Sequence, residues 1–272
     1  MKLRIGLAQF NPYNPLDDID KLAAWGFDYA EPALAPIAAL SDVDFASALQ
    51  RAKASRIRVE ATNMFLPAAL KVAGPSVNQE EVRGYLRKAL ARAEALGVKV
   101  VVFGSGGARS FPEGFPKERA WLQVRDFLRE CGDAIARNNF GMLIAIEELR
   151  KAESNILNTV AESLAMARAV DHPKVQLLAD FFHIATENED SSILLKAGKA
   201  IVHVHIANPN NRRVFPKEPS EDSRYGPFFE NLRAIGYSGR ISVEANTTVE
   251  AFESDARGSL AFLRSVTERR QE

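Results

Sequence analysis

The sequence has few of the features that would place it outside the soluble proteins of the cytoplasm. It contains one cysteine, Cys131, which excludes an intramolecular disulfide. No run approaches the roughly 18 apolar residues of a membrane span, and the apolar stretch in the N-terminal segment MKLRIGLAQF is too short for a signal peptide. Basic and acidic residues number 35 each, so there is no excess positive charge to attract nucleic acid or an anionic membrane. We therefore expect a cytoplasmic protein with neither partner.

What the chain does contain is an alternation of short apolar runs with longer helical patterns. Its 272 residues, 46% of them apolar, suit a single (β/α)8 barrel domain over residues 1–272. The expected strands are 5–10, 29–34, 59–65, 100–104, 142–147, 175–181, 201–206 and 241–244. The expected helices are 16–26, 43–56, 79–97, 117–139, 156–170, 188–198, 225–235 and 248–268. Eight strand–helix units with short connections predict a parallel sheet that closes into a TIM barrel.

Three details of the pattern support one domain rather than two. The helical stretch 79–97 has acidic residues in its first turn and ends at Gly97, a residue type typical of helix C-termini. No Pro/Ser-rich linker divides the chain, and the proline cluster at 111–116 is interpreted as a loop after the fourth strand. The irregular stretch 208–224 is long enough to be a functional loop after the seventh strand.

Four polar residues lie near the C-terminal ends of four successive expected strands. They are Glu147, Asp180, His205 and Glu244, in the segments GMLIAIE, VQLLAD, IVHVHIA and RISVEAN. In a (β/α)8 barrel these strand ends converge on the face where active sites are built. Three carboxylates and one imidazole suit one hard divalent ion, with Mn²⁺ as our first expectation and Mg²⁺, Co²⁺ or Zn²⁺ as alternatives.

Strand alternation provides a test of this site. In the run IVHVHI, Val202, Val204 and Ile206 share the face expected to pack against helices, so His203 and His205 point into the barrel. The same alternation directs the three carboxylates of the candidate site inward. A buried carboxylate without a partner costs several kcal/mol or becomes protonated, and a shared cation would remove that cost for all three.

The other histidines have separate interpretations. His203 lies one inward layer below the candidate ligand, where a hydrogen-bonded core or supporting histidine is favoured. His183 follows the sixth strand; substrate contact is our first expectation, with a second metal or a surface position as alternatives. His172, in the turn DHP, is expected to be exposed.

Two arginine-containing segments are candidates for substrate binding. The segment VVFGSGGARS lacks the Lys-Ser/Thr of a P-loop, so a tight turn is favoured, although its backbone amides and Arg109 could hold an anionic or hydroxylated substrate tail. Arg212 and Arg213 belong to the loop that follows the seventh strand. An arginine pair is usually solvated, but this one extends from a strand of the candidate site.

Four segments together resemble the ketose 3-epimerases, the D-tagatose/D-psicose 3-epimerase group of the xylose isomerase-like barrels. IEELRKAESNILNT resembles the group's E-x-L-N-R-x-x-E-x-x-x-L-N-T segment, and LLADFFH resembles its L-D-x-F-H. HVHIANPNNRRV resembles its H-F-H-T-G-E-x-N-R-R-V, and ISVEAN resembles its final V-x-E strand. The resemblance covers the C-terminal half, and the N-terminal half is similar only to the general barrel.

The resemblance implies the same four metal ligands and adds roles. Glu147 and Glu244 would also form the acid/base pair, and the substrate would be contacted by Glu153, His183 and one arginine of the 212–213 pair. Departures from the group pattern, such as Arg150-Lys151 in place of Asn-Arg, concern the sugar rather than the metal chemistry.

The implied reaction is proton transfer next to a carbonyl. A metal that chelates a ketose carbonyl and a neighbouring hydroxyl would stabilise an enediolate, while two carboxylates remove and return the proton on opposite faces. We expect a metal-dependent ketose 3-epimerase or a related sugar or sugar phosphate isomerase of carbohydrate metabolism, compatible with a homo-oligomer. The alternatives are an inosose dehydratase-like lyase, a hydroxypyruvate isomerase and a non-catalytic sugar-binding barrel. An endonuclease IV-type nuclease is disfavoured because no histidine precedes His172.

Overall fold

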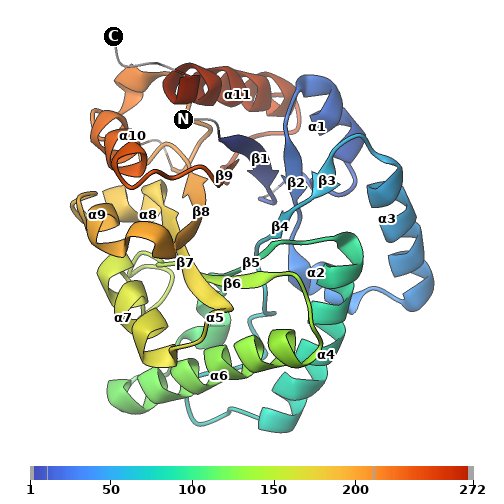
Figure 1. The fold of residues 1–272 in the computed structure, drawn as a ribbon, viewed down its shortest axis with the longest axis vertical. Coiled ribbons are helices and arrows are strands. Elements are labelled where there is room, and N and C mark those ends of the chain that lie inside the picture. Colours follow the sequence, from blue (N-terminus) through green and yellow to red (C-terminus); the bar gives the residue numbers. More distant parts are fainter. Residues whose placement is uncertain (1–2, 11, 211, 269–272) are drawn as a thin grey trace.

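The central feature of the computed structural model is a ring of parallel strands surrounded by helices (Figure 1). The structure describes residues 3–10, 12–210 and 212–268. Neighbouring strands pair in the order β3-β2-β1-β9-β8-β7-β6-β5-β4. The strands are β1 (Arg4–Ala8), β2 (Tyr29–Glu31), β3 (Arg58–Val59), β4 (Ala61–Thr62), β5 (Val100–Phe103), β6 (Leu143–Ile146), β7 (Val175–Asp180), β8 (Ile201–Ile206) and β9 (Arg240–Val243).

The ninth strand arises because the third expected strand is interrupted at Glu60, between β3 and β4. The backbone nevertheless continues the ring there. The Glu60 amide donates to the Ala30 carbonyl at 3.3 Å, and its own carbonyl accepts from the Lys99 amide at 2.8 Å. The predicted (β/α)8 TIM barrel is therefore confirmed, as a nearly closed barrel with one divided strand.

The helices cover the outside of this barrel (Figure 1). They are α1 (Ile19–Trp25), α2 (Leu34–Ala39), α3 (Asp42–Ala54), α4 (Gln79–Leu96), α5 (Gly106–Arg109), α6 (Lys117–Arg137), α7 (Val160–Val170), α8 (Phe181–Thr186), α9 (Ile193–Ala197), α10 (Tyr225–Ala234) and α11 (Phe252–Glu268). Helix α4 begins where the Asn78 side chain accepts from the Glu80 and Glu81 amides, and it ends at Gly97 with φ +84°. No helix of the described ranges combines the length and the apolar character needed to cross a membrane.

The sequence prediction lacks three short helices: α2, α5 and α8. Residues 34–39 form α2, and residues 181–186 form α8, ahead of the expected helix at 188–198. The α8 difference has a local cause, because Asp180 ends β7 and its side chain also caps α8 by accepting from the Phe182 amide at 2.8 Å. Asp180 is thus both the last residue of a strand and the N-cap of the next helix.

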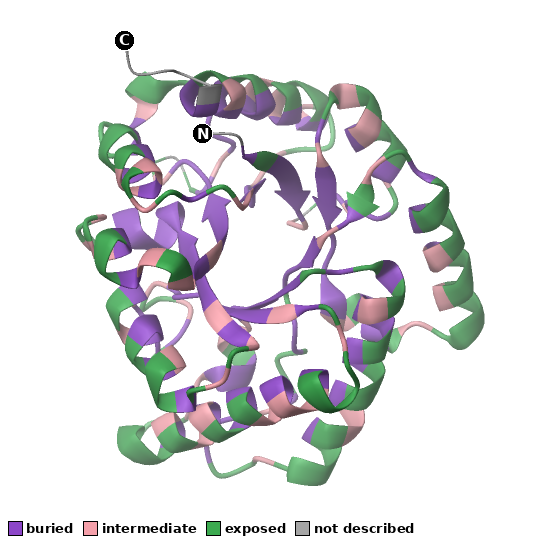
Figure 2. Cartoon of the chain, in the orientation of Figure 1, coloured by how far each residue is buried: buried purple, intermediate pink, exposed green. Residues whose placement is uncertain are grey.

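Burial follows the two-layer arrangement of the barrel: the strands are buried and the outer helix faces are exposed (Figure 2). A large core lies between strands and helices, and a small apolar cluster fills the inside of the barrel. The inward direction predicted for Glu147, Asp180 and Glu244 is confirmed, because ligand atoms of these three residues lie within 4.8 Å of one another. In β8 one prediction is wrong: Val202 packs on the inner cluster, because the register with β7 shifts between Leu177 and Leu178 and a bulge turns Val202 inward.

Candidate active site

The four predicted metal ligands converge at the C-terminal ends of β6, β7, β8 and β9. One ligand atom from each of the four residues lies within 4.8 Å of the others. The His205 Nδ1 atom is 3.2 Å from Glu147 Oε1 and 3.6 Å from Glu244 Oε2. All four side chains are buried, and Asp180 and His205 are inaccessible to solvent. Strand parity, read from the sequence, therefore brings these side chains to one point.

Neighbouring groups hold the backbone and the carboxylates of this cluster. Arg109 donates to the Glu147 carbonyl at 2.8 Å. Gly104, at the end of β5, leaves room for the Glu147 carboxylate, because a Cβ there would lie 2.1 Å from Glu147 Oε2. The Asp180 amide donates to the buried Glu148 carboxyl at 2.7 Å. Each of these contacts restricts where a ligand side chain can lie.

Glu244 is held by an amide and a guanidinium. The Asn63 side-chain amide donates to Glu244 Oε1 at 2.6 Å, and Arg213 donates to the Glu244 carbonyl at 2.9 Å and also to Oε2. Arg213 Nη2 also donates to Asp180 Oδ2 at 2.9 Å. Its guanidinium lies over the ring of Phe182 at 4.6 Å. Arg213 therefore links two of the carboxylates from one side of the cluster.

The crowding of buried negative charge shifts the pKa values of these groups. Burial and then the neighbouring Glu244 raise the pKa of Glu147 to about 7. Burial also raises the pKa of Asp180, although Arg213 opposes the shift. Burial alone would lower the pKa of His205, but the surrounding carboxylates outweigh it and raise this pKa above its usual value. Two basic groups, Arg213 and His205, face three carboxyl groups, so a divalent cation would offset the remaining negative charge.

The donor chemistry fits such a cation. Three carboxylate groups and one imidazole nitrogen match the preferences of Mn²⁺, Mg²⁺ or Co²⁺, and Zn²⁺ also accepts this set. The sulfur of Cys131, which lies buried within α6, is not part of the cluster. The residues present could thus hold one divalent metal ion.

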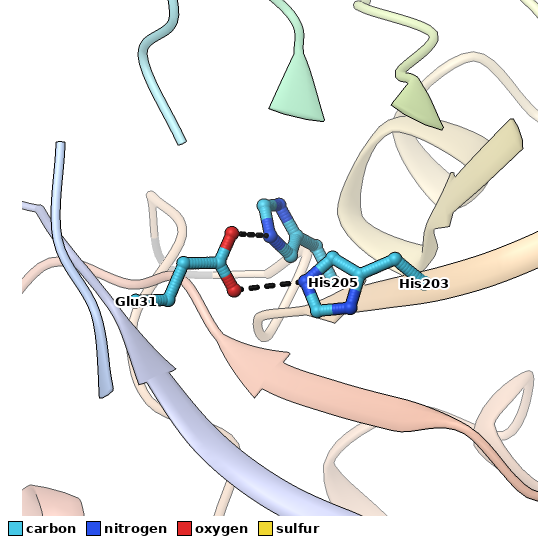
Figure 3. Close-up of side chains that lie close together, drawn as sticks. All are labelled: Glu31, His203 and His205. Atoms are coloured by element: carbon cyan, nitrogen blue, oxygen red, sulfur yellow. Dashed lines mark hydrogen bonds and ion pairs between the residues drawn. The ribbon is translucent and has the colours of Figure 1, made fainter. Parts of the chain in front are cut away.

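A second layer of buried polar side chains lies beside the cluster, centred on Glu31 at the end of β2 (Figure 3). Glu31 Oε1 lies 2.8 Å from His205 Nε2, and Oε2 lies 2.8 Å from His203 Nε2. Ser242 Oγ donates to Oε2 at 2.5 Å and lies 2.6 Å from the Tyr29 hydroxyl. All five residues are inaccessible to solvent.

Of the predicted substrate contacts, His183 and Arg213 border the cluster. His183, in α8, accepts from the Arg150 amide through Nδ1 at 3.2 Å, and its Nε2 lies 3.3 Å from Asp180 Oδ2. Glu153 lies further out, about one-third exposed, with its Oε2 at 4.0 Å from His183 Nε2 and its Oε1 paired with Arg150 at 2.6 Å. These side chains form a polar edge next to the carboxylates.

The two arginines of the 212–213 pair lie in different environments. Arg213 is buried in the site, whereas Arg212 is exposed and contributes its carbonyl to a hydrogen bond from Asn246 at 2.7 Å. Both residues have left-handed φ angles, +64° and +63°, a conformation that is strained for non-glycine residues. The geometry supports substrate contact for Arg213 and a solvent position for Arg212.

The position of Arg109 also differs from the one expected of a substrate-binding residue. Its guanidinium is inaccessible to solvent and donates to the carbonyls of Phe103, Glu147 and Leu157 at 2.8–3.1 Å. These contacts support a role in joining the ends of β5 and β6 to the following loops, not in holding a substrate tail. The expected tight turn after β5 contains the short helix α5.

Sequence reasoning missed the residues that support the ligands, chiefly Glu31, Asn63 and Glu148. Glu31, in the segment DYAEP, lies in the middle of the expected strand 29–34, and only the structure ends β2 at this residue, so the strand-end rule that selected the four ligands did not single it out. Asn63, within the expected strand 59–65, directly follows β4. Glu148 has no signal of an inward position, because it directly follows the inward-pointing Glu147 and strand alternation therefore directs it to the opposite face.

Comparisons with known proteins point to one family. A family model described as xylose isomerase-like TIM barrel matches residues 19–266. D-psicose 3-epimerase from Agrobacterium fabrum is 26% identical over 291 residues, covering 95% of this chain and 94% of that protein. 3-dehydro-D-guloside 4-epimerase from Escherichia coli is 31% identical over 143 residues, which is 52% of each chain. A crystal structure of D-psicose 3-epimerase in the presence of D-fructose superimposes with a TM-score of 0.84 at 21% identity, over 97% of this chain and 99% of the other.

Proposed function

Because this chain belongs to the xylose isomerase-like TIM barrel family, we propose that it is a divalent-metal-dependent ketose 3-epimerase. The observation that carries the proposal is the convergence of Glu147, Asp180, His205 and Glu244, with ligand atoms within 4.8 Å of one another at the C-terminal end of the barrel. The full-length relative named D-psicose 3-epimerase supports the same reaction class. Epimerases are isomerases, so the chain is an isomerase acting on a small sugar.

The four ligands would hold one metal ion, for which Mn²⁺ is our choice. When bound, the ion would polarise the substrate carbonyl and stabilise the negative charge that develops on its oxygen when the neighbouring proton leaves. The protein supplies the remaining steps through its side chains. A cytoplasmic location, one domain over 1–272 and a role in carbohydrate metabolism remain predictions of the sequence.

Glu147 and Glu244 are the proposed proton-transfer pair. They follow β6 and β9, with β7 and β8 between them, so they approach a substrate in the centre of the site from two sides. One carboxylate takes the proton from the carbon next to the carbonyl, and the other delivers a proton to the opposite face, which inverts that carbon. Asn63 and Arg213 hold Glu244 in place, while Gly104 leaves room for Glu147.

The polar edge is proposed to orient the sugar. His183 and Arg213 offer nitrogen donors beside the carboxylates, and Glu153 offers an acceptor at the solvent side. Phe182 and Phe10 flank the Arg213 guanidinium, at 4.6 and 5.1 Å from their ring centres, and restrict its position. These donors and this acceptor would bind the hydroxyl groups of the sugar.

The experiment that tests the proposal is proton–deuterium exchange of a ketose panel with added Mn²⁺. The panel should include free ketoses, ketose phosphates and 3-keto glycosides, since one relative is named as an epimerase of a 3-dehydro-guloside. Exchange with an epimeric product supports the proposal. Exchange with an aldose product indicates an isomerase, loss of water indicates a lyase, and metal retention without exchange on any substrate indicates a sugar-binding barrel.

A further inference from the structure

The buried carboxylate of Glu31 has no part in the proposed proton transfer, yet it contacts one of the metal ligands directly. Its two oxygens receive three groups that come from two other strands: the Nε2 atoms of His203 and His205 and the hydroxyl of Ser242. Glu31, on β2, lies across the barrel from β8, which carries both histidines (Figure 3). All four side chains are inaccessible to solvent.

An ionised carboxylate can only accept hydrogen bonds. At 2.8 Å from Glu31, each histidine Nε2 must therefore carry a proton and donate it. For His203 the remaining nitrogen, Nδ1, has no hydrogen-bond partner among the residues that the structure describes, which fits a ring whose proton is on Nε2. For His205 the remaining nitrogen faces the carboxylates of Glu147 and Glu244.

We propose that Glu31 is a positioning residue that fixes the His205 ring with its proton on Nε2, so that Nδ1 presents its lone pair to the metal. The inference rests on the proposed function for its metal. Metal-bound histidines commonly donate their second ring N–H to a carboxylate, which fixes ring orientation and increases ligand basicity. His203 and Ser242 hold the Glu31 carboxylate from the other side, and the Tyr29 hydroxyl supports Ser242 at 2.6 Å.

The same residues are also candidates for a second metal site, because Glu31, His203 and His205 place ligand atoms within 4.8 Å of one another. Their geometry favours hydrogen bonding instead. Both oxygen–nitrogen separations are 2.8 Å, the length of a charge-assisted N–H···O bond. The number of metal ions per chain distinguishes the two uses.

The first test is nuclear magnetic resonance of the Zn²⁺-loaded protein labelled with ¹⁵N-histidine. The chain has four histidines, so the side-chain spectrum is small enough to assign with single substitutions. We expect a proton directly bonded to Nε2 of His205, none on Nδ1, and one Zn²⁺ per chain. A proton on Nδ1 with Zn²⁺ at Nε2, or a second Zn²⁺ that is lost on His203→Gln, would overturn the inference.

The second test is Mn²⁺ affinity by calorimetry in Glu31→Gln. The amide keeps the shape of the side chain but has one acceptor oxygen, so its NH₂ group faces one of the two histidine N–H donors. We expect Mn²⁺ binding to weaken about 10- to 100-fold, the range typical of changes to groups that hold a metal ligand. Unchanged affinity in the folded variant would contradict the proposal.

The matched control is Glu60→Gln, the same chemical change at a carboxylate near the start of β1 and β9, where it pairs with Arg4 and Arg240. It should leave Mn²⁺ affinity unchanged. The melting temperature of each metal-free variant shows whether a loss of affinity is only a loss of folding, and the spectrum of the unmodified protein decides the question if Glu31→Gln does not fold. Failure of Mn²⁺ and Zn²⁺ to bind the unmodified protein would overturn both proposals. Absence of epimerase activity with the expected protonation at His205 would refute the proposed function alone.

Discussion

Carboxylates are paired differently at the two ends of the barrel. Near the N-terminal ends of the strands, the Glu60 carboxylate meets two arginines, with Arg240 Nε at 2.7 Å and Arg4 Nε at 3.2 Å. The Arg4 side chain is half exposed there. At the C-terminal ends, three carboxylates share Arg213 and the imidazole of His205 in a buried cluster.

The difference indicates which end serves stability and which serves chemistry. At the N-terminal end the Glu60 carboxylate is paired with arginines and the groups are partly exposed to water, so each ion pair contributes little and requires no ligand. Charge at the C-terminal end is unbalanced and dry, a condition that destabilises the protein unless a cation or a substrate compensates it. Active sites of (β/α)8 barrels occupy this same end.

The largest expected effect concerns Glu147→Gln and Glu244→Gln. Each variant removes one of the two proposed proton-transfer groups, and loss of a positioned acid or base costs about 10²- to 10⁴-fold in rate. Epimerisation should be lost in both, while one variant still exchanges the substrate proton with solvent from its intact face. Kinetics and metal content should be measured together. Near-normal turnover in both variants with metal bound would refute the two-carboxylate mechanism.

Arg213→Ala should be the next largest effect, with Arg212→Ala as its neighbour control. Arg213 donates charge-assisted hydrogen bonds to Asp180 and Glu244, so its loss should lower kcat/KM roughly 10- to 100-fold. Arg212 is exposed, and its replacement should change kcat/KM by no more than about twofold. Equal effects of the two substitutions would mean that the loop as a whole, and not the buried guanidinium, matters.

Gly104→Ala tests whether space at the end of β5 sets the position of Glu147. The added Cβ would lie 2.1 Å from Glu147 Oε2, so the carboxylate must move. A small misplacement of a reacting group is costly, and we expect kcat/KM to fall on the order of tenfold. Gly226→Ala in α10 is the control, because a Cβ there meets nothing within 4 Å and alanine favours a helix. Full activity of Gly104→Ala would show that Glu147 tolerates displacement.

The smallest effect is expected at the other end of the barrel. Glu60→Gln weakens the ion pairs with Arg4 and Arg240, of which the Arg4 pair is the more exposed. The two pairs together are worth about 1 kcal/mol, which corresponds to a melting temperature lower by about 2–4 °C. Epimerase kinetics should stay at the unmodified level. A loss of activity comparable to that of Arg213→Ala would remove the functional distinction between the two ends.

Local sequence patterns were sufficient for the barrel and for the four-residue cluster. Alternation with period 2 is a property of each strand alone, and it directs Glu147, Asp180, His205 and Glu244 inward before any pairing is known. The alternation of strands and helices then determines that these strand ends meet. The same alternation directs Glu31 of β2 inward, where its carboxylate reaches His205.

Contacts across the barrel depended on the tertiary structure. The choice between Arg212 and Arg213 follows from two left-handed residues in a long loop, and no periodic pattern encodes that. The buried role of Arg109 depends on the carbonyls that α5 brings it to, and the inward turn of Val202 depends on the register of β8 against β7. Side-chain direction along a strand is set by the local chain geometry, whereas the partner that a side chain reaches is set by how neighbouring strands and loops are placed around the ring.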